Sequence, residues 1–456
     1  MEIGNYIVDK ALKLGVDDIV VDIKSGVTKQ LRFANNEITL ATTWDTVDVG
    51  VFLSYKKRLL SSSLNNPGLS ETFATVGGAT NLTKDAVDKF LERMVKVAKI
   101  LAPKVDYYGI AKGPFKYKPI KDSHDRKIEN LGDKTVDFVE DAIDSAISEG
   151  AKRCAGVLYS SNWEEQKFTS GDVDASEKGS SINVSIRAFA EKDASGHSVS
   201  VSRILKDFNP KKAGSEAGML AKQSLNPVVG ESGKYDVILS PMVAANLLYY
   251  MSYAFSAFEV DSGTSFLIDK IGKKVGSSKV TLVDDCRLEN GFESSSFDEE
   301  GVPTQRTNII EKGVLKTYLH NTSTAKKFKT KTTASAGIIY PQPKNLVLEK
   351  GDSKLDEIIS KVKNGVYITN VWYTRFANYR TSDFSTIPRD AMFEIKNGKI
   401  TKPIKGLRLS DNMKHILENV DSISKDAKTI HWWEVQIPVV TGHVLCKDLN
   451  MTKSAK

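Results

Sequence analysis

The sequence predicts an α+β fold of two domains, with antiparallel sheets, flanking helices and a hairpin-rich C-terminal half. The chain has 456 residues, which is too long for a single hydrophobic core. Alternating, strand-like segments separated by turn residues recur along it, whereas runs of helical periodicity are few. The segment NPVVGESGKY resembles a linker, so we place the N-terminal domain at 1–225 and the C-terminal domain at 226–456, and we consider a sub-boundary near 103–130.

The N-terminal half combines amphipathic helices with alternating strands. Asn35 and Asn36 lie between two alternating runs, which is a hairpin signal. Thr83 precedes a helical pattern and is expected to cap it. Helices are expected over residues 5–14, 83–101, 134–148 and 211–224. Strands are expected near residues 152–160, 164–170, 181–190 and 196–204.

The C-terminal half is mostly a series of hairpins. Glycine follows two polar residues in the turns of NIIEKGVLKTYL, LVLEKGDS and FEIKNGKITKP, where a positive φ is needed. A short helix is expected over 355–363. A longer apolar helix begins after Ser240, its predicted N-cap, with Pro241 at the first helical position, and it contains the stretch LLYYMSYA at 247–254.

Composition and charge restrict the class of protein. The net charge of +7 is modest for this length and does not demand an acidic partner. The most basic stretch, AKKFKTKTT at 325–333, is interpreted as a solvated loop, with an anion or nucleic-acid contact as the alternative. The cysteines are scattered, the start does not resemble a secretory signal, and no run approaches roughly 18 apolar residues. We therefore expect a cytoplasmic protein without a membrane segment or a nucleic-acid partner.

Common catalytic motifs are absent from the sequence. The six histidines form no pair at i,i+4 on a predicted helix, and His443 and Cys446 fall on opposite faces of a predicted strand. The segment GHSVSVSR at 196–203 departs from the GxSxG elbow and alternates like a strand. Neither a phosphate-binding loop nor a GxGxxG motif after a strand is present.

The acidic run SSFDEEGVPTQR at 295–306 is more distinctive. Asp298 and Glu300 stand just before Gly301, which predicts a tight, exposed turn. One interpretation is an ionic latch between Asp298 and Arg306 that holds the turn. Acid–base chemistry by these carboxylates is the alternative.

This run belongs to a longer segment, SSSFDEEGVPTQRTNIIEKGVLKTYLHNTSTAKKF, which resembles the hallmark region of the TldD/PmbA proteins, once described as modulators of DNA gyrase. Further similar segments follow in the family's order: VKNGVYITN, then SDFS at 382–385, then FEIKNGKITKPIKGLRLSDNMKHIL. The resemblance is strong over about 225–446, while the N-terminal half matches loosely through its hairpin-rich pattern. It implies a family with two branches that pair with each other.

The resemblance also implies which branch this chain is similar to. The TldD branch resembles a metallopeptidase, with a helix carrying HExxxH, two zinc-binding histidines and a glutamate that activates water, and with a late cysteine as a further ligand. On this chain the three motif positions fall on Tyr249, Tyr250 and Ala254, and no cysteine stands near IHWWEV at 430–435. His431 and Glu434 lie near that cysteine position and are weak alternative ligands. The chain therefore resembles the PmbA/TldE branch, which lacks these residues, and no metal or other cofactor is expected in it.

The function that this resemblance implies is that of a non-catalytic subunit in a heteromeric metallopeptidase that processes peptides or degrades unfolded polypeptide. Its partner would be an HExxxH-containing TldD-like paralogue that holds zinc, and an extended peptide would be the substrate. Asp298, Arg306 and His320 are the polar groups that we name as candidates for substrate binding, and structural latching of the hallmark hairpin is the simpler interpretation of them. A stand-alone hydrolase, or a peptide-binding or regulatory homodimer without hydrolase activity, remains an alternative. Because this chain needs no zinc geometry, we expect the helix after Ser240 to be more regular than that of the sister branch.

Overall fold

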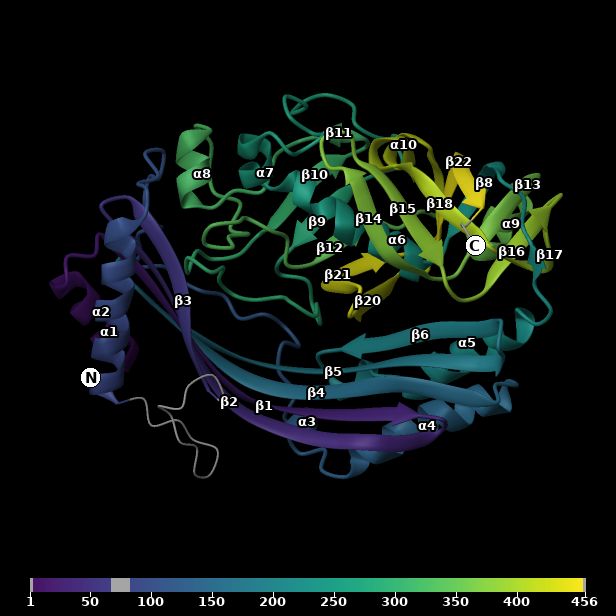
Figure 1. Ribbon diagram of the computed structural model, residues 1–456, viewed down its shortest axis with the longest axis horizontal. Helices are drawn as coiled ribbons and strands as arrows, with labels where there is room; N and C mark the ends of the chain where they lie inside the picture. Colours follow the sequence, from purple (N-terminus) through teal and green to yellow (C-terminus); the bar gives the residue numbers. More distant parts are fainter. Residues whose placement is uncertain (1–2, 67–82, 454–456) are drawn as a thin grey trace.

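Six long antiparallel strands dominate the N-terminal half of the protein (Figure 1). The structure is a computed structural model that describes residues 3–66 and 83–453. The strands lie in the order β3-β2-β1-β4-β5-β6. Their bounds are β1 (Asp18–Ala34), β2 (Glu37–Tyr55), β3 (Arg58–Asn66), β4 (Arg153–Thr169), β5 (Val173–Glu191) and β6 (Ala194–Ser202).

The hairpin between β1 and β2 forms where the sequence predicts it. Asn35 and Asn36 have φ values of 52° and 68°, the left-handed pair that a two-residue turn of this twist requires. The two strands predicted near 152–160 and 164–170 are instead one continuous strand, β4. Residues 161–163 stay in register with β1, with Trp163 opposite Gly26, so their polar character does not interrupt the ladder.

Helices cover one face of this sheet. In Figure 1, α3 and α4 lie on the side of the sheet that is away from the C-terminal half. Their bounds are α1 (Ile3–Lys13), α2 (Lys84–Ile100), α3 (Arg126–Glu129), α4 (Lys134–Ser148), η1 (Leu205–Asp207) and α5 (Pro210–Gln223). The predicted cap of α2 is confirmed, since the Thr83 hydroxyl accepts a hydrogen bond from the amide of Ala86 at 3.2 Å. Two apolar clusters lie under these helices, one beneath α1 and α2 and one beneath α4 and α5.

The opposite face of the sheet faces the C-terminal half and is polar over much of its length, although buried apolar residues such as Val20 and Val173 also lie on it. There the hydroxyls of Thr28 and Ser161 lie 3.0 Å apart on neighbouring strands. At the β6 edge, His197 is buried and its ring packs edge-on against Trp432 of the C-terminal half, with ring centres 4.6 Å apart. The sheet therefore packs one face on the helices, and toward the other half of the chain it uses polar side chains together with a small apolar cluster in which Val173 and Ala175 pack on Phe297.

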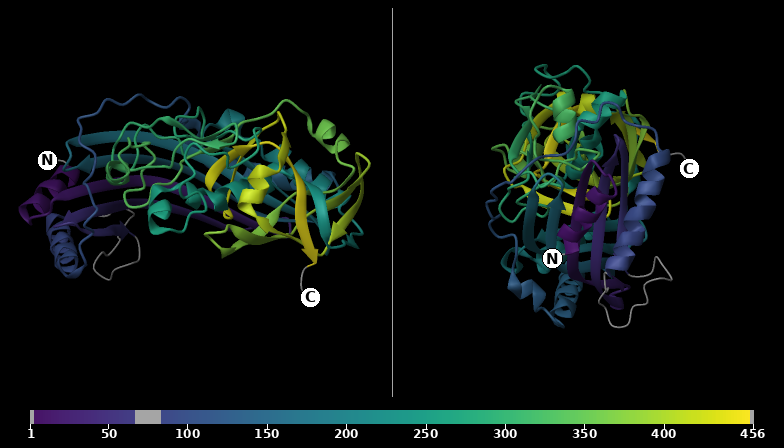
Figure 2. Two further views of the ribbon diagram at one scale, coloured as in Figure 1. Left: turned by 90° about the horizontal axis from the view of Figure 1, so that it is seen from above. Right: turned by 90° about the vertical axis from the view of Figure 1, so that its left-hand side faces the viewer.

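Two mixed sheets form the C-terminal half, which lies above the long sheet in Figure 1 and overlaps it when seen from above in the left view of Figure 2. The larger sheet contains β14 (Val371–Asn378), β15 (Asp383–Pro388), β18 (Leu407–Asn412), β22 (Val444–Lys453), β8 (Gly233–Leu239), β13 (Asn364–Ile368), β16 (Met392–Lys396), β17 (Lys399–Lys405) and β7 (Val228–Val229), with β19 (Val420–Ile423) paired to β22. The smaller sheet contains β11 (Val314–Leu315), β10 (Arg306–Glu311), β9 (Leu282–Asp285), β12 (Leu346–Leu348), β21 (Val435–Thr441) and β20 (Lys428–Trp432). The remaining helices are α6 (Pro241–Met251), η2 (Ser252–Phe255), α7 (Ala257–Ser262), α8 (Thr322–Lys327), α9 (Leu355–Ser360) and α10 (Met413–Glu418).

The α+β class is confirmed, with one difference in sheet type. Most strand pairs are antiparallel, as predicted, but β13 runs parallel to β8, β12 to β21, and β17 to β7. Parallel pairs need long crossover connections, and the helices between these strands supply part of them. No helix in the described part of the chain has the length and hydrophobicity of a membrane span.

The stretch near 103–130, considered as a sub-boundary, is hydrogen-bonded to the C-terminal half. The amide of Tyr108 donates to the Ser323 hydroxyl at 3.0 Å, and the Tyr117 hydroxyl donates to the carbonyl of Gly301 at 2.7 Å. The basic stretch at 325–333, expected as a solvated loop, begins inside α8, and Lys327 forms an ion pair with Asp261 at 2.6 Å. The two halves are thus joined by this connector as well as by the sheet face, and the boundary at 225/226 stays a prediction.

Candidate functional site

The helix that contains LLYYMSYA starts as the sequence predicts. The hydroxyl of Ser240 accepts a hydrogen bond from the amide of Val243 at 3.3 Å, and Pro241 occupies the first turn of α6. Apolar residues surround it on all sides, so α6 is a buried helix between the two C-terminal sheets. Only its last turn, with Tyr249 and Tyr250, is half-exposed.

The α-helix does not continue through the whole of LLYYMSYA, and the comparison of its regularity with that of the sister branch stays a prediction. The α-helix ends at Met251, and residues 252–255 tighten into the 3-10 turn η2. The reason is tertiary, because the chain must leave the helix to pair with residue 319. The amide of Leu319 donates to the carbonyl of Phe255, and the amide of Ala257 donates back to the carbonyl of Leu319. The hydroxyl of Ser265 satisfies the carbonyl of Ala254 at 2.7 Å.

Tyr249, Tyr250 and Ala254, on which the resemblance places the HExxxH motif, lie close to each other but carry no metal-binding chemistry. The side chain of Ala254 is fully buried and has no donor atom. The Tyr249 and Tyr250 rings meet edge to face, with centres 5.2 Å apart. Burial, together with the nearby Glu434 carboxylate, raises the pKa of Tyr250 to about 12, so the phenol stays protonated at neutral pH.

Glu434 completes this site from the turn between β20 and β21. Its side chain is buried, and one carboxylate oxygen accepts a hydrogen bond from the Tyr250 hydroxyl at 3.0 Å. The other oxygen accepts from the backbone amide of Tyr373 at 3.2 Å. The stretch 430–435, singled out because the family's late cysteine falls near it, therefore does lie beside the motif helix.

His431, the other residue considered near that position, points elsewhere. Its ring packs on Phe292, with centres 4.5 Å apart, and burial lowers its pKa to about 4. No hydrogen bond or ion pair between described residues joins His431 to Glu434, Tyr249 or Tyr250. Among the described residues, no group of three or more His, Cys, Asp or Glu side chains is arranged to hold a metal. Since a zinc site needs three or four donors and these positions offer a methyl group and protonated phenols, the residues do not fit zinc.

The acidic run forms a tight turn, but a buried one rather than the exposed turn predicted. Asp298 accepts hydrogen bonds from the amides of Glu300 and Val302, both at 2.9 Å, and Gly301 takes a positive φ of 78°. Glu300 accepts from the amide and hydroxyl of Thr322 at 3.0 and 2.6 Å. Burial, with repulsion from Glu299, raises the pKa of Asp298 to about 7. Burial, with repulsion from Asp298, raises the pKa of Glu300 to about 8. Neither carboxyl group is accessible to a peptide in this structure.

The predicted latch between Asp298 and Arg306 does not form. Arg306 opens β10 directly opposite Asp285 of β9, and its guanidinium reaches Glu349 at 2.6 Å and Asp285 at 3.5 Å. Strand register thus gives this arginine other partners. Its exposed head is the most accessible of the three predicted substrate-binding groups.

His320 is buried beneath α8. Its ring packs on Phe328, with centres 5.4 Å apart, and Nδ1 lies 3.3 Å from the Thr324 hydroxyl. Burial lowers its pKa to about 4, so the ring is neutral. No hydrogen bond or ion pair within the described residues joins any two of Asp298, Arg306 and His320, and their substrate-binding role stays a prediction.

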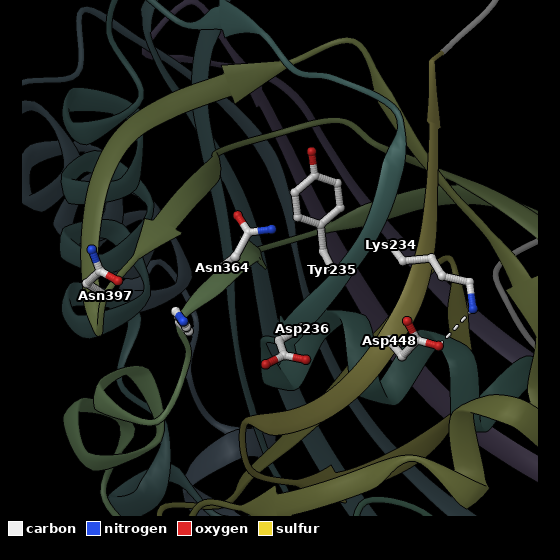
Figure 3. Close-up of a pocket in the computed structure, with 7 residues that line it drawn as sticks. Lys234, Tyr235, Asp236, Asn364, Asn397 and Asp448 are labelled. Atoms are coloured by element: carbon white, nitrogen blue, oxygen red, sulfur yellow. Dashed lines mark hydrogen bonds and ion pairs between the residues drawn. The ribbon is translucent and has the colours of Figure 1, made fainter.

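A pocket of about 340 Å³ opens at the start of β8, away from all of these residues (Figure 3). An ion pair between Lys234 and Asp448 at 2.8 Å lies on one side of it. Its lining is Lys234, Tyr235, Asp236, Lys363, Asn364, Asn397 and Asp448. Its lining contains no histidine, cysteine or serine, and each of its two carboxylates forms an ion pair with a lysine, Asp448 with Lys234 and Asp236 with Lys447. No pattern in the sequence predicts this pocket.

The fold and the site define an α+β protein of one long antiparallel sheet and two mixed sheets, whose buried helix α6 carries no metal-ligand set among the described residues. Two family models match it: residues 232–453 match the PmbA/TldA metallopeptidase C-terminal domain, and residues 118–225 match the central domain. The chain belongs to the PmbA/TldD family.

Individual relatives agree with this assignment. A metalloprotease of Methanocaldococcus jannaschii is 33% identical over 204 residues, which are 42% of this chain and 44% of the relative, so the chain spans less than half of that protein. An uncharacterized protein of the same organism is 31% identical over 330 residues, 70% of this chain and 76% of the relative. The crystal structure of TldE from Thermococcus kodakarensis has the same fold, with a TM-score of 0.84 at 18% identity over 98% of this chain and 99% of that one.

Proposed function

We propose that this chain is a PmbA/TldE-like, non-catalytic subunit of a heteromeric TldD/TldE-type metallopeptidase that processes peptides or degrades unfolded polypeptide. The observation that carries the proposal is the state of the motif helix. Tyr249, Tyr250 and Ala254 occupy the HExxxH positions, and Tyr250 is committed to a hydrogen bond with Glu434. Because the Tyr250 hydroxyl is hydrogen-bonded to the buried Glu434, we interpret these residues as structural rather than as an empty metal site.

The catalytic zinc would belong to an HExxxH-containing paralogue. In this proposal the present chain stabilises that partner and helps to position an extended peptide. Two features support the second role: the polar face of the long sheet, and the sheet edges, where a peptide can add by main-chain hydrogen bonds that tolerate many sequences. A cytoplasmic location and the absence of a nucleic-acid partner remain part of this proposal.

The test is to co-express the chain with the HExxxH paralogue encoded in the same genome. We expect the two chains to copurify, with about one zinc per pair, and the pair to cleave an unfolded polypeptide that the single chain leaves intact. A matched control changes the glutamate of the paralogue's HExxxH to glutamine, which should abolish cleavage without separating the chains.

Two results contradict the proposal. Stoichiometric zinc and peptide cleavage by this chain alone would make it an enzyme in its own right. A stable homodimer that binds peptides and ignores the paralogue would instead support the alternative of a stand-alone peptide-binding or regulatory protein.

A further inference from the structure

Two arginines flank one exposed tyrosine beside the tyrosine-filled motif helix. The guanidinium carbons of Arg375 and Arg389 lie 5.7 and 5.3 Å from the centre of the Tyr373 ring. Trp433 packs on the same ring at 6.2 Å and is 53% exposed, while Tyr373 is 39% exposed. We call Tyr373, Arg375, Arg389 and Trp433 the arginine–aromatic surface.

The backbone is distorted so as to present this surface. Tyr373 has a φ of 57°, a left-handed conformation that is costly for a bulky residue. The register of β14 on β15 shifts between Trp372 and Arg375, so an extra residue bulges there. Thr374 points inward, where its hydroxyl bonds Asn246 at 2.6 Å, and the exposed Tyr373 and Arg375 stand on either side of it. Such strain persists only where surrounding contacts hold it, and it is concentrated at functional sites.

The strained backbone at Tyr373 is held by Glu434, which is itself bonded to Tyr250 of α6. Glu434 accepts a hydrogen bond from the strained amide of Tyr373 and another from the Tyr250 hydroxyl. Nη1 of Arg375 lies 3.2 Å from that same hydroxyl and also donates to the carbonyl of Thr374 at 2.7 Å. Glu434 and Tyr250 therefore fix both the bend of β14 and the direction of one guanidinium.

The guanidinium groups of this surface have no anionic partner among the described residues. Nearby Arg187 is neutralised by the buried Asp390 at 2.6 Å, and Glu434 is enclosed by its two donors. Arg375 and Arg389 are both exposed, and neither forms an ion pair with any described residue. Guanidinium groups stacked on aromatic rings keep their hydrogen-bond donors free, and carboxylate is the anion that this geometry suits in a peptide.

We propose that the arginine–aromatic surface binds a carboxylate group of an extended peptide, either an Asp or Glu side chain or the C-terminal carboxylate. The inference rests on the proposed function, since it names the chemistry of the polypeptide that the chain would help to position. Tyr250 and Glu434 act as positioning residues in this site. The aromatic rings contact the peptide next to the carboxylate and favour no particular side chain there.

The test measures fluorescence anisotropy of four labelled ten-residue peptides with the full chain. They carry two glutamates or two glutamines, each with a free or an amidated C terminus. We expect the neutral, amidated peptide to bind about tenfold more weakly than the acidic, free one, with a difference that shrinks as salt is added. If replacing the glutamates by glutamines weakens binding, the bound carboxylate is a side chain. If amidation of the C terminus weakens binding, the bound carboxylate is the terminal one.

Variants of the protein locate the effect. Arg375→Gln combined with Arg389→Gln should weaken binding of the preferred peptide about tenfold and leave the neutral, amidated one unchanged. Arg380→Gln is the matched control, because Arg380 is exposed, makes no ion pair with a described residue and carries the same charge. Tyr250→Phe should cause a smaller loss for the preferred peptide and leave the neutral, amidated one unchanged, whereas Tyr249→Phe should change neither.

Equal binding of all four peptides by the unaltered chain overturns the inference, even where the arginine variants fail to fold. So does an equal loss in Arg380→Gln, and so does the absence of measurable binding. Failure of the chain to join the paralogue would overturn the proposed function, yet charge-dependent binding at these arginines would still stand, so the two outcomes are distinguishable.

Discussion

Three residues of the hallmark region, Asp298, Glu300 and His320, owe their shifted pKa values to burial more than to charged neighbours. Asp298 and Glu300 lie in a sequence that reads as a surface turn, yet both carboxyl groups are enclosed, and burial is the first cause of their raised pKa values of about 7 and 8. His320 shows the converse, since burial lowers the pKa of an imidazole. The hallmark acidic run is therefore interpreted as an internal brace between the turn at Gly301 and the start of α8.

Replacing Glu300 with glutamine should change how stability depends on pH. The pKa of Glu300 is higher in the folded chain than the ordinary 4.5, so the folded state binds more protons than the unfolded state between about pH 5 and 8. The free energy of unfolding of the natural chain should therefore fall as pH rises through that range. Glu300→Gln cannot titrate, so its stability relative to the natural chain should improve by at least about 1 kcal/mol from pH 5.5 to 8.5.

Urea unfolding at several pH values measures this difference. The surface substitution Glu418→Gln serves as the control and should show no such trend. A constant difference between the natural chain and Glu300→Gln across the range would contradict the raised pKa.

At the scale of elements, neighbouring residues in the sequence determine where helix α6 begins, whereas a tertiary contact determines where it ends. Ser240 and Pro241 fix the start of α6 through a cap and a preset φ, both readable from the sequence. Its end is set by residue 319, which pairs with the chain on both sides of Ser256 and forces the tight turn η2. The second histidine position of the motif falls inside that turn, at Ala254.

Restoring the metal motif by substitution should therefore fail at Ala254. Its side chain is fully buried, and an imidazole there must displace packed neighbours, so Ala254→His should lower the free energy of unfolding by about 1–3 kcal/mol or more. Tyr249→His, at a half-exposed position, should cost less. A triple variant with Tyr249→His, Tyr250→Glu and Ala254→His should not bind stoichiometric zinc in metal analysis. Tight zinc binding with unchanged stability would show that the site had been kept ready for a metal.

At the scale of the whole molecule, a buried polar network docks the long sheet onto the C-terminal half. Burial alone would raise the pKa of Asp390, but the Arg187 guanidinium, helped by nearby His197 and by bonds from Asn370 and Ser195, holds it below its ordinary range. Nδ2 of Asn370 donates to Asp390 at 2.9 Å and lies 2.8 Å from Nδ1 of His197. Because that amide donates to the ring, Nε2 of His197 carries the proton and faces the Ser185 hydroxyl at 2.8 Å, so this histidine is a structural donor rather than a base for the serine.

Removing the carboxylate should loosen this junction. Asp390→Ala leaves Arg187 and Asn370 without their buried acceptor, so we expect a loss of roughly 3 kcal/mol in the free energy of unfolding. Asp193→Ala breaks an exposed ion pair with Lys405 across the same two halves and should have little effect. Chemical denaturation of both variants makes the comparison. Equal effects would show that Asp390 has no special role in the docking.

The sequence by itself determined the features that a few neighbouring residues encode. These include the Asn35–Asn36 hairpin, the caps at Thr83 and Ser240, the α+β class and, through the resemblance, the family. Only the tertiary structure decided that Asp298 is buried, that Arg306 pairs with strand neighbours, and that Glu434 and Tyr250 hold Arg375 toward solvent. The physical reason is distance along the chain. Caps and turns are satisfied within a few residues, whereas Tyr250 and Glu434 are 184 positions apart, and only the packing of α6 against β21 brings them together.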